Sequence, residues 1–406
     1  MLILACRNNS RLVRIIFCLI LMHTRPVHSL LQSYPTAETL IFSSSSTTRL
    51  PTLQMAQVDK GFNLLEIASK VVPQGRIVQT AKESWKFAWK RMMTELAPQD
   101  KTGSYQRPKY SFSRTIGSKQ FPIEAGRYHV YVGNPCPWCH RVRLVAKLLS
   151  LETIKGTNNK SLLEMTTLVD DPIKASRGGW VFATPPLQLS EVKDLRELYE
   201  ALSPGFQGRC TAPLLVDWKT RQIISNESSD IVRMLPLLLS AKEPNESAID
   251  LYPSDLASKV DETNEWIYRL LNNGVYRCGF STSQEAYQQA SKGVLEGLDQ
   301  AETILQEQDF ICGGKVTESD LLLLPTMLRF DGVYSPLFGA GGKHLRLQCD
   351  YPAIFAWLKR CWQLEGVRES IDIEDACSSY YRQLFPLNPG GILPTQVSAK
   401  SLRLED

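Results

Sequence analysis

Two cysteines three residues apart are the side chains of this sequence best suited to chemistry. They stand in the motif Cys136-Pro137-Trp138-Cys139, which follows the largely apolar run 128–133 after two residues, Asn134 and Pro135. A cysteine between the end of a strand and the first turn of a helix faces unpaired N–H groups and the positive helix end, which favour the thiolate. Pro137 suits the first helical position, where its missing N–H costs nothing. We therefore predict that Cys136 is a nucleophile and that Cys139, one turn further along, is its more buried partner.

Basic residues after the motif would raise the local positive potential. Arg141 and Arg143 are expected to contribute, with His140 as a further candidate. The main alternative for two such cysteines is half of a zinc site, but that needs a second pair at similar spacing, and the later cysteines lie far apart. We therefore predict no metal site, while an iron–sulfur cluster shared between subunits through a reactive thiolate stays open.

Two further patterns could hold a ligand. Thr211-Ala212-Pro213 precedes an apolar run, and a proline before a strand can be cis and leave the backbone of Ala212 available to an extended peptide. Glu227 and Ser228 open the next predicted helix, where a helix N-terminus with polar side chains can hold carboxylate and ammonium groups. Taken alone, this second pattern is more often an ordinary N-cap.

The predicted strands and helices alternate in the first part of the chain around these residues, and only helices are predicted after it. Up to residue 245, periodicity predicts strands at 128–133, 162–169, 179–183, 214–218 and 222–225, and helices at 141–150, 191–202 and 228–238. This pattern is typical of a small mixed α/β sheet ending in a hairpin. Between 250 and 385 we predict an all-α region with helices at 255–272, 283–308, 318–331 and 352–362. Thr317 and Asp320 form a capping box, which is a structural role.

The chain begins with a segment typical of a targeting peptide. Residues 1–57 are rich in arginine and serine and contain a single acidic residue, Glu38, and they include an apolar run, 15–22, too short to span a bilayer. We predict a transit peptide, with the plastid as the first expectation and a mitochondrial or secretory route as alternatives. A helical extension is expected at 58–120, with its helix over 58–96, and an irregular tail at 386–406.

Composition excludes several function classes. A length of 406 residues with 43% hydrophobic and 22% charged residues is ordinary for a globular protein of two domains. The net charge of +4 and the lack of a basic and aromatic face argue against nucleic-acid binding. No stretch after the leader reaches 18 apolar residues, so a membrane span in the mature chain is not expected.

The order of these signals resembles the glutathione transferase superfamily. Several motifs are more closely similar to its Xi class, the glutathionyl-hydroquinone reductases, over residues 121–394. They are Arg127-Tyr128-His129-Val130-Tyr131, Gly179-Trp180-x-Phe182, Leu195-Arg196-x-x-Tyr199, Asn273-Gly274-Val275-Tyr276-Arg277-Cys278-Gly279-Phe280, Arg329-Phe330-Asp331-x-Val333-Tyr334 and Asn388-Pro389-x-Gly391-Ile392. The resemblance implies a thioredoxin-like, glutathione-binding domain at 121–245, an all-helical domain at 250–385 and a homodimer.

The resemblance also implies roles for single residues. Cys136 matches the family's nucleophile, and glutathione would be a co-substrate. Tyr276, Tyr334 and either Tyr380 or Tyr381 would line the pocket for an aromatic acceptor, and Tyr276 or Tyr334 would be the catalytic proton donor to the leaving aromatic carbon or its ketone tautomer. The residues expected to bind glutathione are Trp180, Arg196, Ala212, Pro213, Glu227 and Ser228.

Two positions depart from the Xi pattern: Cys139 stands where alanine is usual, and Leu337-Phe338 follows Tyr334 where His-Phe is usual. Cys136 is expected to take glutathione from a glutathionyl-hydroquinone as a mixed disulfide, which a second glutathione clears. With Cys139 taking part, the alternative is a glutaredoxin-like or dehydroascorbate reductase. A non-catalytic glutathione-binding redox sensor is the third possibility. Conjugation of glutathione to electrophiles is less expected, because a cysteine at this position forms disulfides with glutathione.

Overall fold

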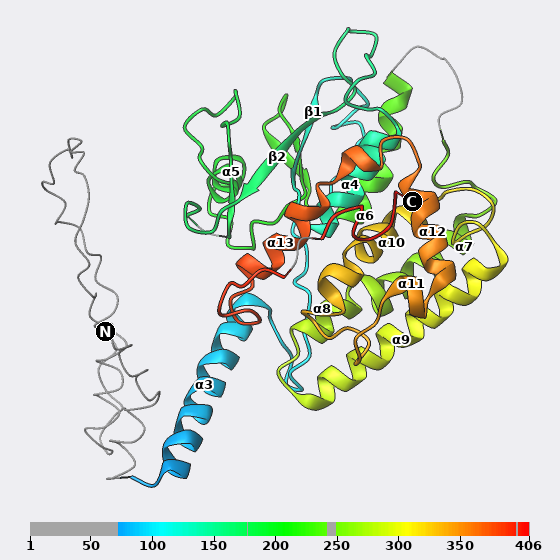
Figure 1. The fold of residues 1–406 in the computed structure, drawn as a ribbon. Coiled ribbons are helices and arrows are strands. Elements are labelled where there is room, and N and C mark those ends of the chain that lie inside the picture. Colours follow the sequence, from blue (N-terminus) through cyan, green and yellow to red (C-terminus); the bar gives the residue numbers. More distant parts are fainter. Residues whose placement is uncertain (1–71, 177, 242–248, 395–396, 406) are drawn as a thin grey trace, which may run out of the picture. The chain divides into compact units, whose positions relative to one another are not determined.

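The computed structural model describes residues 72–176, 178–241, 249–394 and 397–405, and these belong to one compact unit, Ala68–Asp406. The predicted targeting peptide and residues 58–71 of the predicted extension lie outside the described residues. The described residues form a five-stranded sheet followed in sequence by a helical half (Figure 1). The predicted fold class is confirmed.

The sheet has the order β3-β2-β1-β4-β5, with β1 in the centre. The strands are β1 (Tyr128–Gly133), β2 (Glu164–Asp170), β3 (Trp180–Val181), β4 (Leu214–Asp217) and β5 (Gln222–Ser225). β1 runs parallel to β2 and antiparallel to β4, and Val130 pairs with both Met165 and Leu215. β4 and β5 form the predicted hairpin. β1 is apolar because neighbours cover both of its faces.

Three helices cover the sheet. α4 (Pro137–Leu148) packs on β1 and on α6 (Ser228–Met234), while α5 (Leu195–Leu202) contacts β3 and β5 (Figure 1). α5 begins later than predicted because Asp194 is its N-cap, accepting a hydrogen bond from the N–H of Glu197 at 2.9 Å. α6 passes into a 3-10 helix, η1 (Leu235–Ala241), where Pro236 lacks the N–H for continued α-helical bonding.

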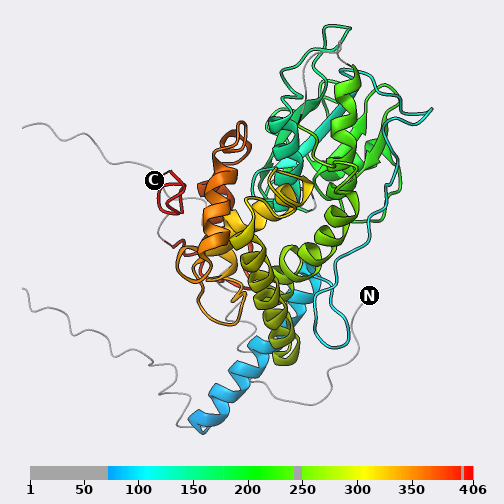
Figure 2. The ribbon, with the colours of Figure 1, turned by 90° about the vertical axis from the view of Figure 1, so that its right-hand side faces the viewer.

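The second half is helical, as predicted. Its elements are α7 (Ala257–Trp266), η2 (Ile267–Asn272), α8 (Gly274–Gly279), α9 (Gln284–Glu307), α10 (Glu318–Arg329), η3 (Phe330–Tyr334), α11 (Leu347–Asp350), α12 (Pro352–Trp362), η4 (Arg368–Ser370) and α13 (Ile373–Gln383). α10 is buried along its whole length and packs against α4, which joins the two halves (Figures 1 and 2). Its capping box is present, with the N–H of Thr317 donating to Asp320 at 2.9 Å.

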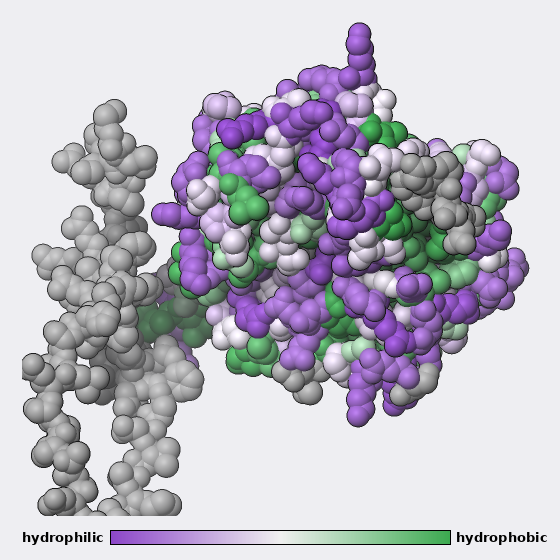
Figure 3. Space-filling model, turned by 90° about the horizontal axis from the view of Figure 1, so that it is seen from above, coloured by the Kyte–Doolittle hydropathy of each residue, from purple (hydrophilic) through white to green (hydrophobic). Residues whose placement is uncertain are grey.

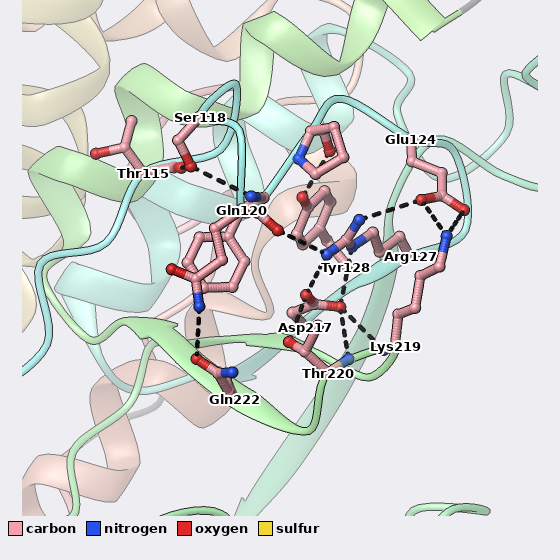
Figure 4. Close-up of polar contacts among 12 residues, drawn as sticks. Thr115, Ser118, Gln120, Glu124, Arg127, Tyr128, Asp217, Lys219, Thr220 and Gln222 are labelled. Carbon is pink, nitrogen blue, oxygen red and sulfur yellow. Dashed lines mark hydrogen bonds and ion pairs between the residues drawn. The ribbon is translucent and has the colours of Figure 1, made fainter.

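A polar network ties the start of β1 to the β4–β5 hairpin (Figure 4). The buried Arg127 guanidinium donates to both carboxylate oxygens of Asp217, at 3.1 and 2.7 Å. Although burial opposes the charged form, hydrogen bonds from Arg127 keep the pKa of Asp217 below its ordinary value. Glu124 bridges Arg127 to Lys219 at the rim. The network fixes the sheet at the end away from the cysteine motif.

The first described helix, α3 (Gln74–Leu96), is mostly exposed, and Met93 is its buried residue. It begins after Pro73, so the predicted helix over 58–96 does not continue unbroken through this proline. No helix of the described residues is long and apolar enough to cross a membrane. The face in Figure 3 is largely hydrophilic, with small scattered apolar patches.

The bridging segment, residues 97–121, connects α3 to the sheet and contacts both halves. On the helical side, Gln99 donates to the carbonyl of Phe280 at 2.8 Å. On the sheet side, the N–H of Arg114 donates to the carbonyl of Ile224 at 3.0 Å. The residues between these two anchors therefore pass the face on which the cysteine motif lies.

Candidate active site

Cys136 lies at the N-cap of α4, with Pro137 at the first helical position, as predicted. The helix begins at Pro137, four residues before the predicted start. Gly133, the last residue of β1, leaves room for the Trp180 ring, since a Cβ added there would lie 2.2 Å from it. This contact places Trp180 beside the loop that presents Cys136.

The surroundings of Cys136 favour its thiolate. The neighbouring thiol of Cys139, the backbone N–H groups of Cys139 and Trp138 and the charge of Arg107 outweigh burial and lower the pKa of Cys136 to about 7. Burial raises the pKa of Cys139 well above its ordinary value, and its side chain is fully buried. Near neutral pH the pair therefore has one reactive and one protonated sulfur, as the motif predicted.

A buried arginine of the helical half holds the loop before Cys136. Arg329 donates to the carbonyls of Pro135 and Asn134, at 3.2 and 3.1 Å. His140 contacts Arg329 and Ser370, and burial, helped by the charges of Arg329 and Arg143, lowers its pKa well below the ordinary value. His140 is therefore a neutral structural residue, and its predicted positive contribution is wrong.

The predicted role of the other two cations also changes. Arg143 donates to the side chain of Asn134 at 3.3 Å, and its charge acts on Cys139. Arg141 is buried and donates to Asn272 and Ser228, at 2.6 and 3.3 Å. Both arginines therefore build the frame of the site.

The cation that acts on Cys136 comes from the bridging segment and was not predicted. The Arg107 guanidinium lies 3.5 Å from the ring centre of Trp138 and donates to the hydroxyl of Tyr110 at 2.5 Å. Trp138 also contacts Arg141, three residues further along α4, at 4.5 Å. No periodicity or motif in the sequence pointed to Arg107. Its role depends on the bridging segment passing close to the N-terminus of α4.

Cys136 opens into a cleft of about 740 Å³. Its lining combines the motif, the edge before β4 and cations from outside the sheet, namely Cys136, Trp138, Trp180, Ala212, Pro213, Asn226, Ser228, Arg107, Lys109 and Arg209 among others. The Ala212–Pro213 bond is cis, and the thiol of Cys136 lies 3.7 Å from the carbonyl oxygen of Ala212. Tyr199 donates to the carbonyl of Thr211 at 2.8 Å and steadies this edge.

Glu227 and Ser228 lie at the start of α6, as predicted, but Glu227 also caps the helix. Its Oε1 accepts from the N–H and hydroxyl of Ser229, at 3.0 and 2.8 Å, and from the hydroxyl of Ser228 at 3.3 Å. Ser228 is buried and lines the cleft. The N-cap interpretation and a ligand site are therefore compatible at this position.

Arg196 is not among the residues that line the cleft, and its predicted role as a glutathione ligand stays a prediction. Its guanidinium donates to the carbonyl of Phe206 at 3.0 Å and to the sulfur of Cys210 at 3.5 Å. It also contacts Glu200 at 3.5 Å. These contacts hold the loop between α5 and β4, which carries the lining residue Arg209.

The predicted tyrosines form a cluster of three phenols beside Trp138. The hydroxyl oxygens of Tyr276, Tyr334 and Tyr380 lie 3.3, 2.6 and 3.0 Å from one another. The ring of Tyr276 stacks near that of Trp138, with 6.2 Å between centroids. Burial raises the pKa of all three, so they are neutral proton donors. Tyr381 is not a member, because its hydroxyl donates to Gly332.

Among the described residues, no group of three or more His, Cys, Asp or Glu side chains could hold a metal ion. Cys136, Cys139, Cys278, Cys312, Cys349, Cys361 and Cys377 are not joined in disulfides.

Comparisons with known proteins agree on one family. The family described as Glutathione S-transferase, C-terminal domain, matches residues 284–360. The glutathionyl-hydroquinone reductase YqjG of Escherichia coli is 35% identical over 72% of this chain and 88% of its own length. The corresponding values for the reductase PcpF of Sphingobium chlorophenolicum are 34%, 68% and 84%.

Solved structures give the same result. The Xi glutathione transferase of Phanerochaete chrysosporium superposes with a TM-score of 0.66 at 34% identity, over 73% of this chain and 94% of that one. The glutathione-bound structure of YqjG gives a TM-score of 0.62 at 32% identity, over 71% and 92%. The chain belongs to the glutathione transferase superfamily, and the solved structures similar to it include members of the Xi class of that superfamily.

Proposed function

We propose that this enzyme removes glutathione from glutathionyl-hydroquinones through a mixed disulfide at Cys136. One observation carries the proposal. The only sulfur of the motif that lines the cleft is Cys136, whose pKa is about 7, and three neutral phenols lie beside the adjacent Trp138. Relatives named glutathionyl-hydroquinone reductases support this choice of substrate.

The glutathionyl half would occupy the sheet side of the cleft. The cis Ala212–Pro213 bond lies at the edge of the cleft, where the backbone of Ala212 can pair with an extended peptide. Trp180 covers Gly133, the last residue of β1. Because the capping contacts of Glu227 use Oε1, its other carboxylate oxygen would meet the ammonium group of the γ-glutamyl end. With Arg196 engaged elsewhere, Arg107 or Arg209 would meet a glutathione carboxylate.

In the first step the thiolate of Cys136 attacks the glutathionyl sulfur. The new sulfur–sulfur bond forms as the sulfur–aryl bond breaks, and its electron pair goes to the aromatic carbon or, in the ketone tautomer, to the enolate. That carbon needs a proton, which Tyr276 can supply, because it is neutral and relays to Tyr334 and Tyr380. The product is the hydroquinone, and glutathione stays on Cys136.

In the second step a free glutathione attacks the mixed disulfide. Glutathione disulfide leaves and the Cys136 thiolate returns, so each turnover consumes one free glutathione thiol, and its sulfur and that of the conjugate are oxidised to the disulfide as one sulfur–aryl bond is reduced.

The test follows hydroquinone release from a glutathionyl-hydroquinone by the full chain with excess glutathione. We expect release by the wild type and by Cys349→Ser, since Cys349 is exposed and does not line the cleft. Cys136→Ser should release none. Binding of glutathione without release by the wild type would refute the proposal and favour the redox-sensor alternative.

A further inference from the structure

The buried sulfur of the motif has no part in the mechanism above, yet it lies directly behind the nucleophile. Cys136 lines the cleft, whereas Cys139 is fully buried and is not among the lining residues. The two residues occupy the N-cap and the third position of α4, which places both side chains on one face of the first turn. A substrate therefore reaches Cys136 from the cleft, whereas Cys139 lies on the side of Cys136 that faces the protein interior.

We propose that Cys139 is a resolving thiol, which attacks Cys136 Sγ in the mixed disulfide, releases glutathione and leaves an internal Cys136–Cys139 disulfide. This inference rests on the proposed function, because it starts from the same mixed disulfide. It adds a second activity: the reduction of small glutathione disulfides to thiols by the two protein thiols, with no free glutathione needed until the enzyme is regenerated. Two glutathione molecules, or one dithiol reductant, then reduce the internal disulfide.

The geometry suits this displacement. In thiol–disulfide exchange the attacking sulfur approaches along the line of the bond that breaks. Cys136 meets the cleft and Cys139 lies on its buried side, where the two thiols already share a hydrogen bond, so Cys139 is within reach of Cys136 Sγ from the side away from the cleft. Cβ atoms three apart on a helix are about 5–6 Å apart and a disulfide needs about 3.5–4.5 Å, so the first turn must tighten by roughly 1–2 Å.

The proton of Cys139 also becomes easier to remove at the right stage. In the reduced enzyme, burial comes first in raising its pKa, and the hydrogen bond and charge of the Cys136 thiolate raise it further. Once Cys136 carries glutathione, its sulfur is uncharged and these two contributions are lost, while the charge of Arg143 still favours the Cys139 thiolate. The departing glutathione thiolate takes up the proton, so charge and electrons balance.

The surrounding structure supports a local movement of this kind. The loop before Cys136 is held by Arg329, and the later residues of α4, among them Val142 and Val145, pack in the core, so the first turn, which carries Cys139, is the part between two held segments. Closing the disulfide requires movement of that turn alone. The bulk of α4 stays packed on β1 and α6.

The experiment uses the reduced full chain and one equivalent of glutathione disulfide as the probe, with no free glutathione. All proteins carry Cys349→Ser, because that exposed thiol could itself take up glutathione. In the parent we expect both halves of the probe to appear as glutathione and the protein mass to fall by two hydrogens, with Cys136 and Cys139 in one linked peptide pair. With Cys139→Ser, only one half should be released, and the other should stay on Cys136.

Retention of the glutathionyl group by the parent, as in Cys139→Ser, would overturn the inference. Cys139→Ala serves as the second variant, since a buried hydroxyl could disturb folding, and thermal melting checks both proteins. Cys136→Ser should not react, which would confirm the order of attack, whereas its glutathionylation at Cys139 would contradict that order. Because the probe contains no quinone, a negative result with hydroquinone release intact refutes only the resolving role.

Discussion

The thiol of Cys139 should control the acidity of Cys136 in the reduced enzyme. Its hydrogen bond is the largest influence lowering the pKa of Cys136 from 9.0 to about 7. Replacement by alanine removes that bond and leaves the backbone N–H groups and Arg107 to oppose burial. The pKa of Cys136 should therefore rise towards 9.0 in Cys139→Ala.

The size of the change in Cys136 reactivity follows from the two limiting pKa values, about 7 in the wild type and 9.0 for an ordinary thiol. With a pKa of about 7, roughly half of Cys136 is thiolate at pH 7, and at the upper limit about one molecule in a hundred is. Since only the thiolate reacts, alkylation of Cys136 by iodoacetamide at pH 7 should slow by up to about fifty-fold. Above the ordinary pKa, the two proteins should react at similar rates.

The assay measures the alkylation rate of Cys136 against pH, with peptide mass spectrometry to identify the modified residue. Cys349→Ala is the matched control, because it removes an exposed thiol outside the cleft and should leave the profile unchanged. A profile for Cys139→Ala that coincides with the wild type would show that the helix N-terminus and Arg107 account for the low pKa, and would refute the reasoning.

Three further variants test other parts of the site. Arg107→Gln should raise the pKa of Cys136 less than Cys139→Ala does, since Arg107 is the smaller influence, and the same pH profile would show a reversed order if this is wrong. Tyr276→Phe should slow hydroquinone release about 10²- to 10⁴-fold while leaving Cys136 alkylation unchanged, and equal release would exclude this phenol as the proton donor. Arg329→Lys should lower the free energy of unfolding by about 1–3 kcal/mol in denaturant titration, because buried carbonyls of the loop before Cys136 lose donors; unchanged stability would contradict that role.

Local patterns predicted the elements that carry the cysteine motif. The run 128–133 is β1 and 222–225 is β5, because an apolar run ending in glycine and a close hairpin are signals within a few residues. The prediction for 352–362 also matches α12, which starts at a proline. Helix ends were less accurate: α4 starts at Pro137 because this proline already begins the helix, and Pro73 interrupts the predicted first helix.

The roles of residues whose partners are distant in the sequence could not be predicted from local sequence patterns. Arg107 was missed because it reaches Trp138 through the path of the bridging segment. Arg196 was assigned to glutathione, but its partners lie on the loop after α5. His140 looked like a cation next to the motif, and its burial against Arg329 is visible only in the fold. The targeting peptide and the plastid stay predictions, since residues 1–57 lie outside the described residues.

The most direct test is a single turnover of Cys139→Ser with one equivalent of glutathionyl-hydroquinone and no free glutathione. If Cys136 accepts the glutathionyl group, one equivalent of hydroquinone should be released and mass spectrometry should find glutathione on Cys136 alone. Two results would contradict the mixed-disulfide mechanism. One is that hydroquinone release requires free glutathione already in the first turnover, and the other is that hydroquinone is released although the enzyme acquires no glutathionyl group.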